Sequence, residues 1–154
     1  MSIRLATAAD AGAVHALVHA LAVYEKMEGE FSARPADFAR LMADGTCAAL
    51  LAEEGAGPIG IALFYPIVST FVGRRSIWLE DLFVLPEHRG GGHGLALLKT
   101  LARHAVDDDF AGVEWNVLDW NTPAIGFYRR IGAEAREGWT DQRLSGAALQ
   151  ALAA

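Results

Sequence analysis

The sequence predicts a mixed α/β fold, and three observations lead to it. Strand-like and helix-like segments alternate along the chain, with no long linker and no internal repeat. Three apolar runs, at residues 47–52, 59–68 and 77–84, predict an antiparallel meander. A glycine-rich loop at residues 89–94 then leads into a helix and a strand at 112–118, a unit that implies locally parallel pairing.

The segments before and within the meander follow from residue spacing. A short strand at residues 3–5 precedes two helices, at 7–24 and 35–45, whose apolar residues recur at helical intervals. The strands of the meander are joined by residues 53–58 and 72–75, which contain the glycines that tight turns favour. Two helices therefore precede the sheet.

The C-terminal part predicts another helix, a strand and a last short helix. Asn121 is suited to an N-cap, Pro123 to the first helical turn, and Gly132 to the stop after the helix. A strand at residues 139–144 and a short helix reaching Ala154 complete the expected order.

Length and composition fit one domain over residues 1–154, with 53% hydrophobic and 21% charged residues. No apolar run reaches the roughly 18 residues that a membrane helix needs, and no secretory signal is visible. Cys47 is the only cysteine, so we expect the reducing cytoplasm. A net charge of −6 disfavours nucleic acid as a partner and suits a cationic ligand. His15 and His19 lack further ligands nearby in sequence, so we expect no metal site.

The stretch from Arg89 to Gly94 is suited to a phosphate or diphosphate. Its four glycines let consecutive N–H groups approach a ligand, the following helix adds the positive end of its dipole, and Arg89 adds a full charge. A Walker loop is excluded because no Gly-Lys-Ser/Thr follows, and the dinucleotide fingerprint fails at Leu95. The alternative is an ordinary strand-to-helix turn.

The spacing Arg89-x-x-Gly92-x-Gly94 between a strand and its helix resembles the signature of the GNAT superfamily of acyl-CoA-dependent N-acetyltransferases. Residues 24–28, 79–84, 119–133 and, more briefly, 137–139 resemble its diamine branch, which includes spermidine/spermine and thialysine N-acetyltransferases. The resemblance covers nearly the whole chain. It implies a GNAT-like α/β fold with a mixed, mostly antiparallel sheet flanked by helices, acetyl-CoA as cosubstrate, and a homodimer. His93 departs from the branch, which usually has an apolar residue there.

Acetyl transfer to an amine needs a group that removes a proton, because an alkylamine with a pKa near ~10.4 is protonated at neutral pH. In the strand at residues 77–84, strict alternation puts Glu80 on the face of Trp78 and Asp81 on the opposite face with Phe83. The resemblance implies that Glu80 accepts the proton through water and that Asp81 helps to hold the cation. A structural ion pair is the alternative for each carboxylate.

Tyr128 lies two helical turns after Asn121, so both project from one side of the predicted helix. The resemblance implies that Tyr128 donates a proton to the leaving thiolate and that backbone N–H groups at residues 82–84 bind the carbonyl oxygen. The alternative for Tyr128 is a role in packing alone, and the alternative for Asn121 is a role as a helix cap alone. The residues expected to bind acetyl-CoA are Leu82, Phe83, Val84, Arg89, Gly90, Gly91, Gly92, His93, Gly94, Leu95, Asn121, Pro123, Ala124 and Tyr128.

Acidic and aromatic residues are the expected complement of an ammonium group. The residues expected to bind the acceptor are Tyr24, Glu25, Glu80, Asp81, Glu114, Trp115, Asn116, Glu137 and Trp139. A solvated surface role is the alternative for each. We therefore expect an N-acetyltransferase that acts by direct attack of a polyamine, diamine or thialysine-like or lysine-like acceptor. Two other functions remain open: a GNAT enzyme for a protein N-terminus, a protein lysine or an antibiotic amine, and a non-catalytic CoA-binding sensor.

Overall fold

The computed structural model describes residues 1–55 and 57–154, which form two compact units. The first unit is Met1–Asn116 and the second is Val117–Ala154. Within the described residues, no helix combines the length and apolarity needed to cross a membrane.

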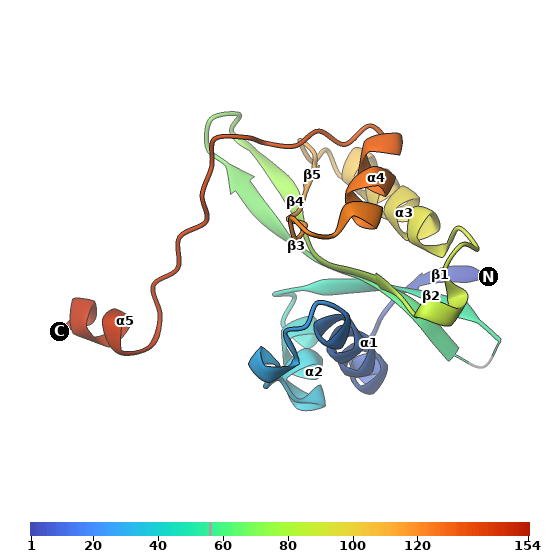
Figure 1. The fold of residues 1–154 in the computed structure, drawn as a ribbon, viewed down its shortest axis with the longest axis horizontal. Helices are drawn as coiled ribbons and strands as arrows, with labels where there is room; N and C mark the ends of the chain where they lie inside the picture. Colours follow the sequence, from blue (N-terminus) through green and yellow to red (C-terminus); the bar gives the residue numbers. More distant parts are fainter. Residues whose placement is uncertain (56) are drawn as a thin grey trace. The chain divides into compact units, whose positions relative to one another are not determined.

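A five-stranded sheet of order β1-β2-β3-β4-β5 forms the centre of the first unit (Figure 1). The first four strands pair antiparallel, and the fifth pairs parallel to β4. The predicted meander and the parallel strand after the glycine loop are therefore confirmed. Of the predicted turn at 53–58, residue 56 lies outside the described residues. The strands are β1 (Ser2–Leu5), β2 (Ala48–Glu54), β3 (Gly57–Ser69), β4 (Arg74–Val84) and β5 (Val113–Glu114).

Helices cover both faces of this sheet. In Figure 1, α1 and α2 lie on one face and α3 lies on the other. The helix α3 begins at His93, inside the expected loop, because Gly92 with φ +81° already serves as its N-cap. The helices are α1 (Ala11–Tyr24), α2 (Pro35–Ala43) and α3 (His93–Asp107), with short 3₁₀ turns η1 (Ala8–Asp10), η2 (Glu28–Glu30) and η3 (Pro86–His88).

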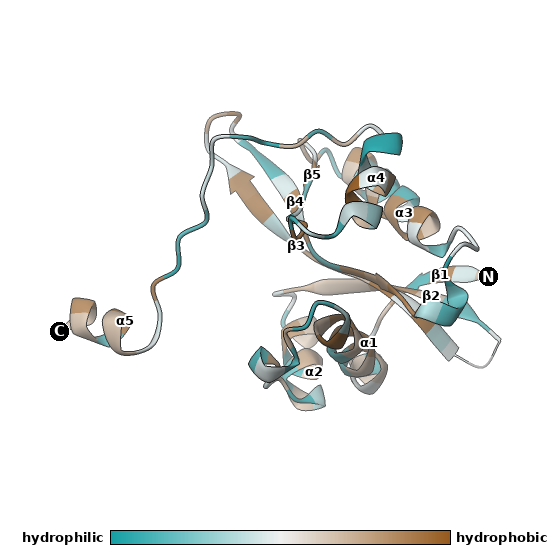
Figure 2. Ribbon diagram, in the orientation of Figure 1, coloured by the Kyte–Doolittle hydropathy of each residue, from teal (hydrophilic) through white to brown (hydrophobic). Residues whose placement is uncertain are grey.

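The core of the first unit lies between the sheet and its helices. The α1 side chains Val14, Leu17 and Leu21 recur at helical spacing and are buried against the sheet. Leu51 and Ile61 are fully buried in the middle strands. Figure 2 shows hydrophobic colouring along α1 and these strands. This packing holds the C-terminal end of α1 over β4, beside Asp81.

Two predicted strands differ from the structure. Of residues 112–118, only Val113–Glu114 pair, because β4 bulges just beyond its pairing with β5 and a bulge interrupts a regular ladder. Residues 139–144 form neither helix nor strand. Apolar alternation alone does not make a strand, since the backbone N–H and C=O groups of a strand need a partner strand.

The second unit contains two helices, α4 (Thr122–Arg130) and α5 (Gly146–Ala153). As predicted, Asn121 caps α4: its side chain accepts a hydrogen bond from the Ala124 N–H at 3.4 Å. Gly132 follows the helix with φ +89°, a conformation that favours glycine. The predicted helical segments of this part of the chain are confirmed.

Candidate active site

A β-bulge in β4 determines where the two candidate carboxylates point. Leu63 of β3 pairs with Asp81 and Phe64 pairs with Leu79, so Glu80 is an extra residue with no partner of its own. An extra residue breaks the alternation of faces. Glu80 and Asp81 therefore both reach the face that carries α1 and α2. The prediction that they lie on opposite faces is wrong.

The Glu80 carboxylate is held by two aromatic donors. Tyr65 and Trp78 are paired across β3 and β4. The Tyr65 hydroxyl and the Trp78 indole N–H each donate to Oε2 of Glu80 at 2.7 Å. Burial, and then the hydrogen bond to Glu80, raise the pKa of Tyr65 well above its ordinary value, so its hydroxyl keeps its proton and donates. Glu80 itself is exposed, so water reaches its carboxylate.

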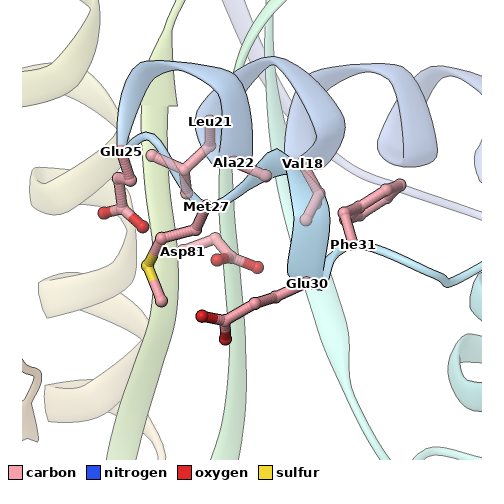
Figure 3. A pocket seen from close by; sticks show the side chains of 8 residues that line it. All are labelled: Val18, Leu21, Ala22, Glu25, Met27, Glu30, Phe31 and Asp81. Atoms are coloured by element: carbon pink, nitrogen blue, oxygen red, sulfur yellow. The ribbon is translucent and has the colours of Figure 1, made fainter.

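A pocket of about 160 Å³ lies beside Asp81 on the same face (Figure 3). Its apolar wall comes mostly from α1 and from Phe31, and its charged groups are carboxyls. In Figure 3, the carboxyl group of Asp81 lies between those of Glu25 and Glu30. The lining residues are Val18, Leu21, Ala22, Glu25, Met27, Glu30, Phe31 and Asp81.

Within the described residues, no basic side chain balances the carboxyl groups of this acidic pocket. Burial first, and then repulsion by Glu80 and Glu25, raise the pKa of Asp81 to about 7. Burial also raises the pKa of Glu25. Within the described residues, no ion pair joins Asp81, Glu25 or Glu30 to a basic side chain. A bound cation would supply the missing charge.

The edge of β4 next to this pocket is open where the acyl group is expected. The β4–β5 ladder ends at the pair Trp78–Glu114. The three residues expected to bind acetyl-CoA through their backbone, Leu82, Phe83 and Val84, pair with β3. Their other edge has no strand partner within the described residues. Phe83 is 4% exposed, so only its backbone is available to a ligand.

The glycine loop has the local geometry that an anion requires. Gly90 and Gly92 have φ of +83° and +81°, which other residues rarely adopt. At Gly91, a Cβ would lie only 2.8 Å from the Nε2 atom of His93. The loop delivers the chain to the start of α3, whose first N–H groups, including those of Gly94 and Leu95, have no acceptor within the helix. The residues fit a diphosphate.

Arg89 connects the residues expected to bind acetyl-CoA with one expected to bind the acceptor. Its Nε donates to the Val84 carbonyl at 2.9 Å. Its guanidinium carbon lies 4.5 Å from the centre of the Tyr24 ring and 5.3 Å from that of Phe83. A residue expected to bind the acceptor, Tyr24, thus contacts one expected to bind acetyl-CoA.

A histidine pair adjoins the loop. Oε2 of Glu54 lies 3.2 Å from Nδ1 of His88 and 3.5 Å from Nε2 of His93. His93 is 6% exposed, and its Nδ1 lies 3.0 Å from the sulfur of Met1. Glu54 therefore links the end of β2 to both flanks of the glycine loop.

The other predicted acceptor residues of the first unit lie at its end. Glu114 stands opposite Trp78 in the parallel ladder, and Trp115 and Asn116 follow it. Unlike Glu25 and Asp81, they do not line the acidic pocket.

The remaining predicted residues belong to the second unit. Asn121, Pro123, Ala124 and Tyr128 lie at the cap and in the body of α4. The rings of Phe127 and Tyr128 are 5.4 Å apart. Glu137 and Trp139 are exposed, and the Arg136 guanidinium lies 5.7 Å from the Trp139 ring.

Sequence reasoning missed Tyr65, Trp78, Glu30 and Glu54. The first two depend on strand register, which a single sequence does not reveal, although an aromatic two residues before a carboxylate in a strand was a signal for Trp78. The acidic run after α1 was a signal for Glu30. Nothing in the sequence links Glu54 to His93.

No metal centre is evident among the described residues, where no group of three possible ligands comes together. Nε2 of His15 bonds with the Ala33 carbonyl at 3.1 Å, and His19 pairs with Glu28.

Residues 14–133 match the model of the Acetyltransferase (GNAT) family. The chain is 35% identical over 169 residues to a thialysine N-epsilon-acetyltransferase of Sus scrofa, covering 98% of this chain and 96% of the relative. It is 34% identical over 140 residues to the protein of that name from Caenorhabditis elegans, with coverages of 89% and 87%. The fold resembles the crystal structure of a ribosomal-protein-alanine N-acetyltransferase from Brucella melitensis, with a TM-score of 0.75, 24% identity, and coverages of 94% and 100%.

Proposed function

The chain belongs to the GNAT acetyltransferase family, and from this premise we propose that its acceptor amine binds beside Asp81 in the acidic pocket. It is an acetyl-CoA-dependent N-acetyltransferase that acts on a primary amine of a small cationic acceptor. The uncompensated carboxylates of the pocket are the observation that carries the proposal. They attract an ammonium group, and the apolar wall accommodates the alkyl chain behind it.

The charge of the pocket also bears on which amine is preferred. Its lining includes Glu25, Glu30 and Asp81 but no basic side chain. A carboxylate on the acceptor therefore meets repulsion, whereas a second ammonium group meets attraction. The relatives compared above are named for thialysine. We expect this chain to accept diamines and polyamines at least as well as thialysine.

Two side chains handle protons in the proposed reaction. Oε1 of Glu80 takes a proton from the acceptor ammonium, directly or through water, and the electron pair of that N–H bond stays on nitrogen. A C–N bond forms as the C–S bond breaks, and Tyr128 donates its phenolic proton to the leaving sulfur. The second proton of the amine leaves through water and restores the phenol. No covalent acyl-enzyme is required.

We assign the binding of acetyl-CoA to the glycine loop and to residues at the starts of α3 and α4. Bound acetyl-CoA supplies an activated thioester. Backbone N–H groups of residues 90–95 hold its diphosphate, and the open edge of β4 at Leu82–Val84 binds its acyl arm and the carbonyl oxygen that gains charge. Asn121, Pro123 and Ala124 contribute the start of α4.

A thiol-release assay with acetyl-CoA and spermidine, putrescine, thialysine or lysine tests the activity. Transfer to at least one of these amines is expected. If calorimetry shows acetyl-CoA binding but no amine is acetylated, the chain is a sensor and the proposal fails. Tyr128→Phe should lower kcat much more than acetyl-CoA affinity, and an unchanged kcat removes its assigned role.

A matched pair of variants tests the acidic pocket. Glu25→Gln should raise the KM of the acceptor about tenfold, because it removes one of the charges that face the ammonium. Glu28→Gln, the same change three residues later on an exposed side chain outside the pocket, should leave KM unchanged. Equal values for both variants would place the acceptor elsewhere.

We also propose that the two units form one domain, which assembles as a homodimer. The family match runs through the boundary at residue 117, which supports a single domain. The dimer rests on the resemblance to the diamine branch. Light scattering that gives the mass of a monomer would overturn it.

A further inference from the structure

The hydrogen bonds around Glu80 are unevenly distributed over its two oxygens. Both the Tyr65 hydroxyl and the Trp78 indole N–H donate to Oε2, each at 2.7 Å. Within the described residues, Oε1 accepts no hydrogen bond. One oxygen is therefore fixed by the protein, and the other is left to solvent or substrate.

The two donors come from a regularly paired part of the sheet. Tyr65 and Trp78 face each other across the antiparallel β3–β4 ladder. Tyr65 packs against the buried cluster beneath α1 and α2. Glu80 occupies the bulge two residues beyond Trp78, where no ladder partner constrains it. Its carboxylate direction therefore depends on these two hydrogen bonds.

We propose that Tyr65 and Trp78 are positioning residues that clamp Oε2 of Glu80 and thereby direct Oε1 to the acceptor ammonium. This inference rests on the proposed function, in which Glu80 removes the amine proton. The clamp makes the two carboxylate oxygens unequal: Oε2 is a permanent acceptor, and Oε1 is the atom that gains and loses the proton.

The chemistry of the donors suits this division. An indole N–H donates only, and the raised pKa of Tyr65 keeps its phenol protonated. Neither group therefore takes the amine proton, which goes to Oε1 and from there to water, since Glu80 is exposed. The clamp thus leaves Oε1 as the oxygen that meets the cationic acceptor.

The neighbouring Asp81 makes the clamp necessary. The two carboxylates share one face, and their mutual repulsion contributes to the raised pKa of Asp81. A freely rotating Glu80 side chain would swing away from Asp81 toward solvent. The two aromatic donors hold it in place against that repulsion.

Conservative variants test the clamp. Tyr65→Phe removes one hydroxyl and Trp78→Phe removes one N–H, and each should lower kcat about tenfold with little change in acetyl-CoA KM. The acceptor KM should also change little in both, so the loss falls on kcat and is largest in the double variant. Phe71→Leu, at a fully exposed aromatic side chain between β3 and β4, is the control and should behave as wild type.

Glu80→Gln separates this inference from the proposed function. If Glu80→Gln is as active as wild type, the assignment of the base fails. If Glu80→Gln is nearly inactive while the Tyr65 and Trp78 variants keep the wild-type kcat, the clamp alone is refuted. Circular dichroism and thermal melting exclude misfolding. A folded variant in which the KM of acetyl-CoA or of the acceptor rises as much as kcat falls also contradicts the clamp.

Discussion

Glu80 and Asp81 adjoin in the sequence and share one face of the sheet, yet their surroundings differ in kind. Oε2 of Glu80 accepts two hydrogen bonds from aromatic side chains. The Asp81 carboxyl accepts none from the described residues and borders an apolar wall, where burial raises its pKa to about 7. Glu80 is therefore stabilised by hydrogen-bond donors, whereas Asp81 would be stabilised by a bound cation. This difference predicts how stability and acceptor binding depend on pH.

Asp81 should make stability depend on pH. Its folded pKa of about 7 exceeds the ordinary value of 3.8, so between these pH values the folded state holds a proton that the unfolded state has lost. The free energy of unfolding therefore decreases as pH rises from about 4 to about 7. Asp81→Asn should be more stable than wild type at pH 8, by up to about 4 kcal/mol, and similar to it at pH 4.

Urea unfolding at several pH values measures this difference. Glu87→Gln, an amide substitution at an exposed carboxylate with no assigned partner, serves as the control and should change stability little at any pH. A gain for Asp81→Asn that is the same at pH 4 and pH 8 would mean that its charge is not the cause.

The same carboxyl should control acceptor binding. A cationic amine prefers the ionised form of Asp81, so the acceptor KM should fall as pH rises through about 7. The amine stays protonated over this range, so the change arises from the protein. Steady-state kinetics with putrescine between pH 6 and 8 measure it. In Asp81→Asn the KM should be higher and flat over this pH range; a slope equal to that of wild type contradicts the assignment.

The sequence predicted the meander, the helices and the glycine loop because each depends on local spacing or turn chemistry. The sequence did not predict the bulge at Glu80, since a bulge exists only in the register between two strands. Period-2 alternation therefore placed Glu80 and Asp81 on opposite faces, although Asp81 does share a face with Phe83 as predicted. Tyr65 lies 15 residues before Glu80 and meets it through that same register. Glu25 and Asp81 were predicted from the resemblance, but their shared pocket follows from the packing of α1 on β4.

The core beneath the site should be sensitive to truncation. Leu51 is fully buried in β2, so Leu51→Ala leaves a cavity and should lower the free energy of unfolding by about 2–5 kcal/mol. Leu5→Ala, at a side chain that is 58% exposed in β1, should cost under about 1 kcal/mol. Urea denaturation of both variants measures the contrast, and similar losses would contradict the buried position of Leu51.

A pair of glycine substitutions should have effects of opposite sign. Gly92 has φ +81° at the cap of α3, so Gly92→Ala should cost about 1–2 kcal/mol of stability. Gly12 lies in α1 with ordinary φ, and a Cβ added there would have no atom within 4 Å, so Gly12→Ala should stabilise by about 0.5–1 kcal/mol. Only Gly92→Ala should also weaken acetyl-CoA binding, because it displaces the N–H groups of the loop. Calorimetric titration of both variants decides this: acetyl-CoA affinity that is unchanged in Gly92→Ala would show that the diphosphate does not bind at the loop.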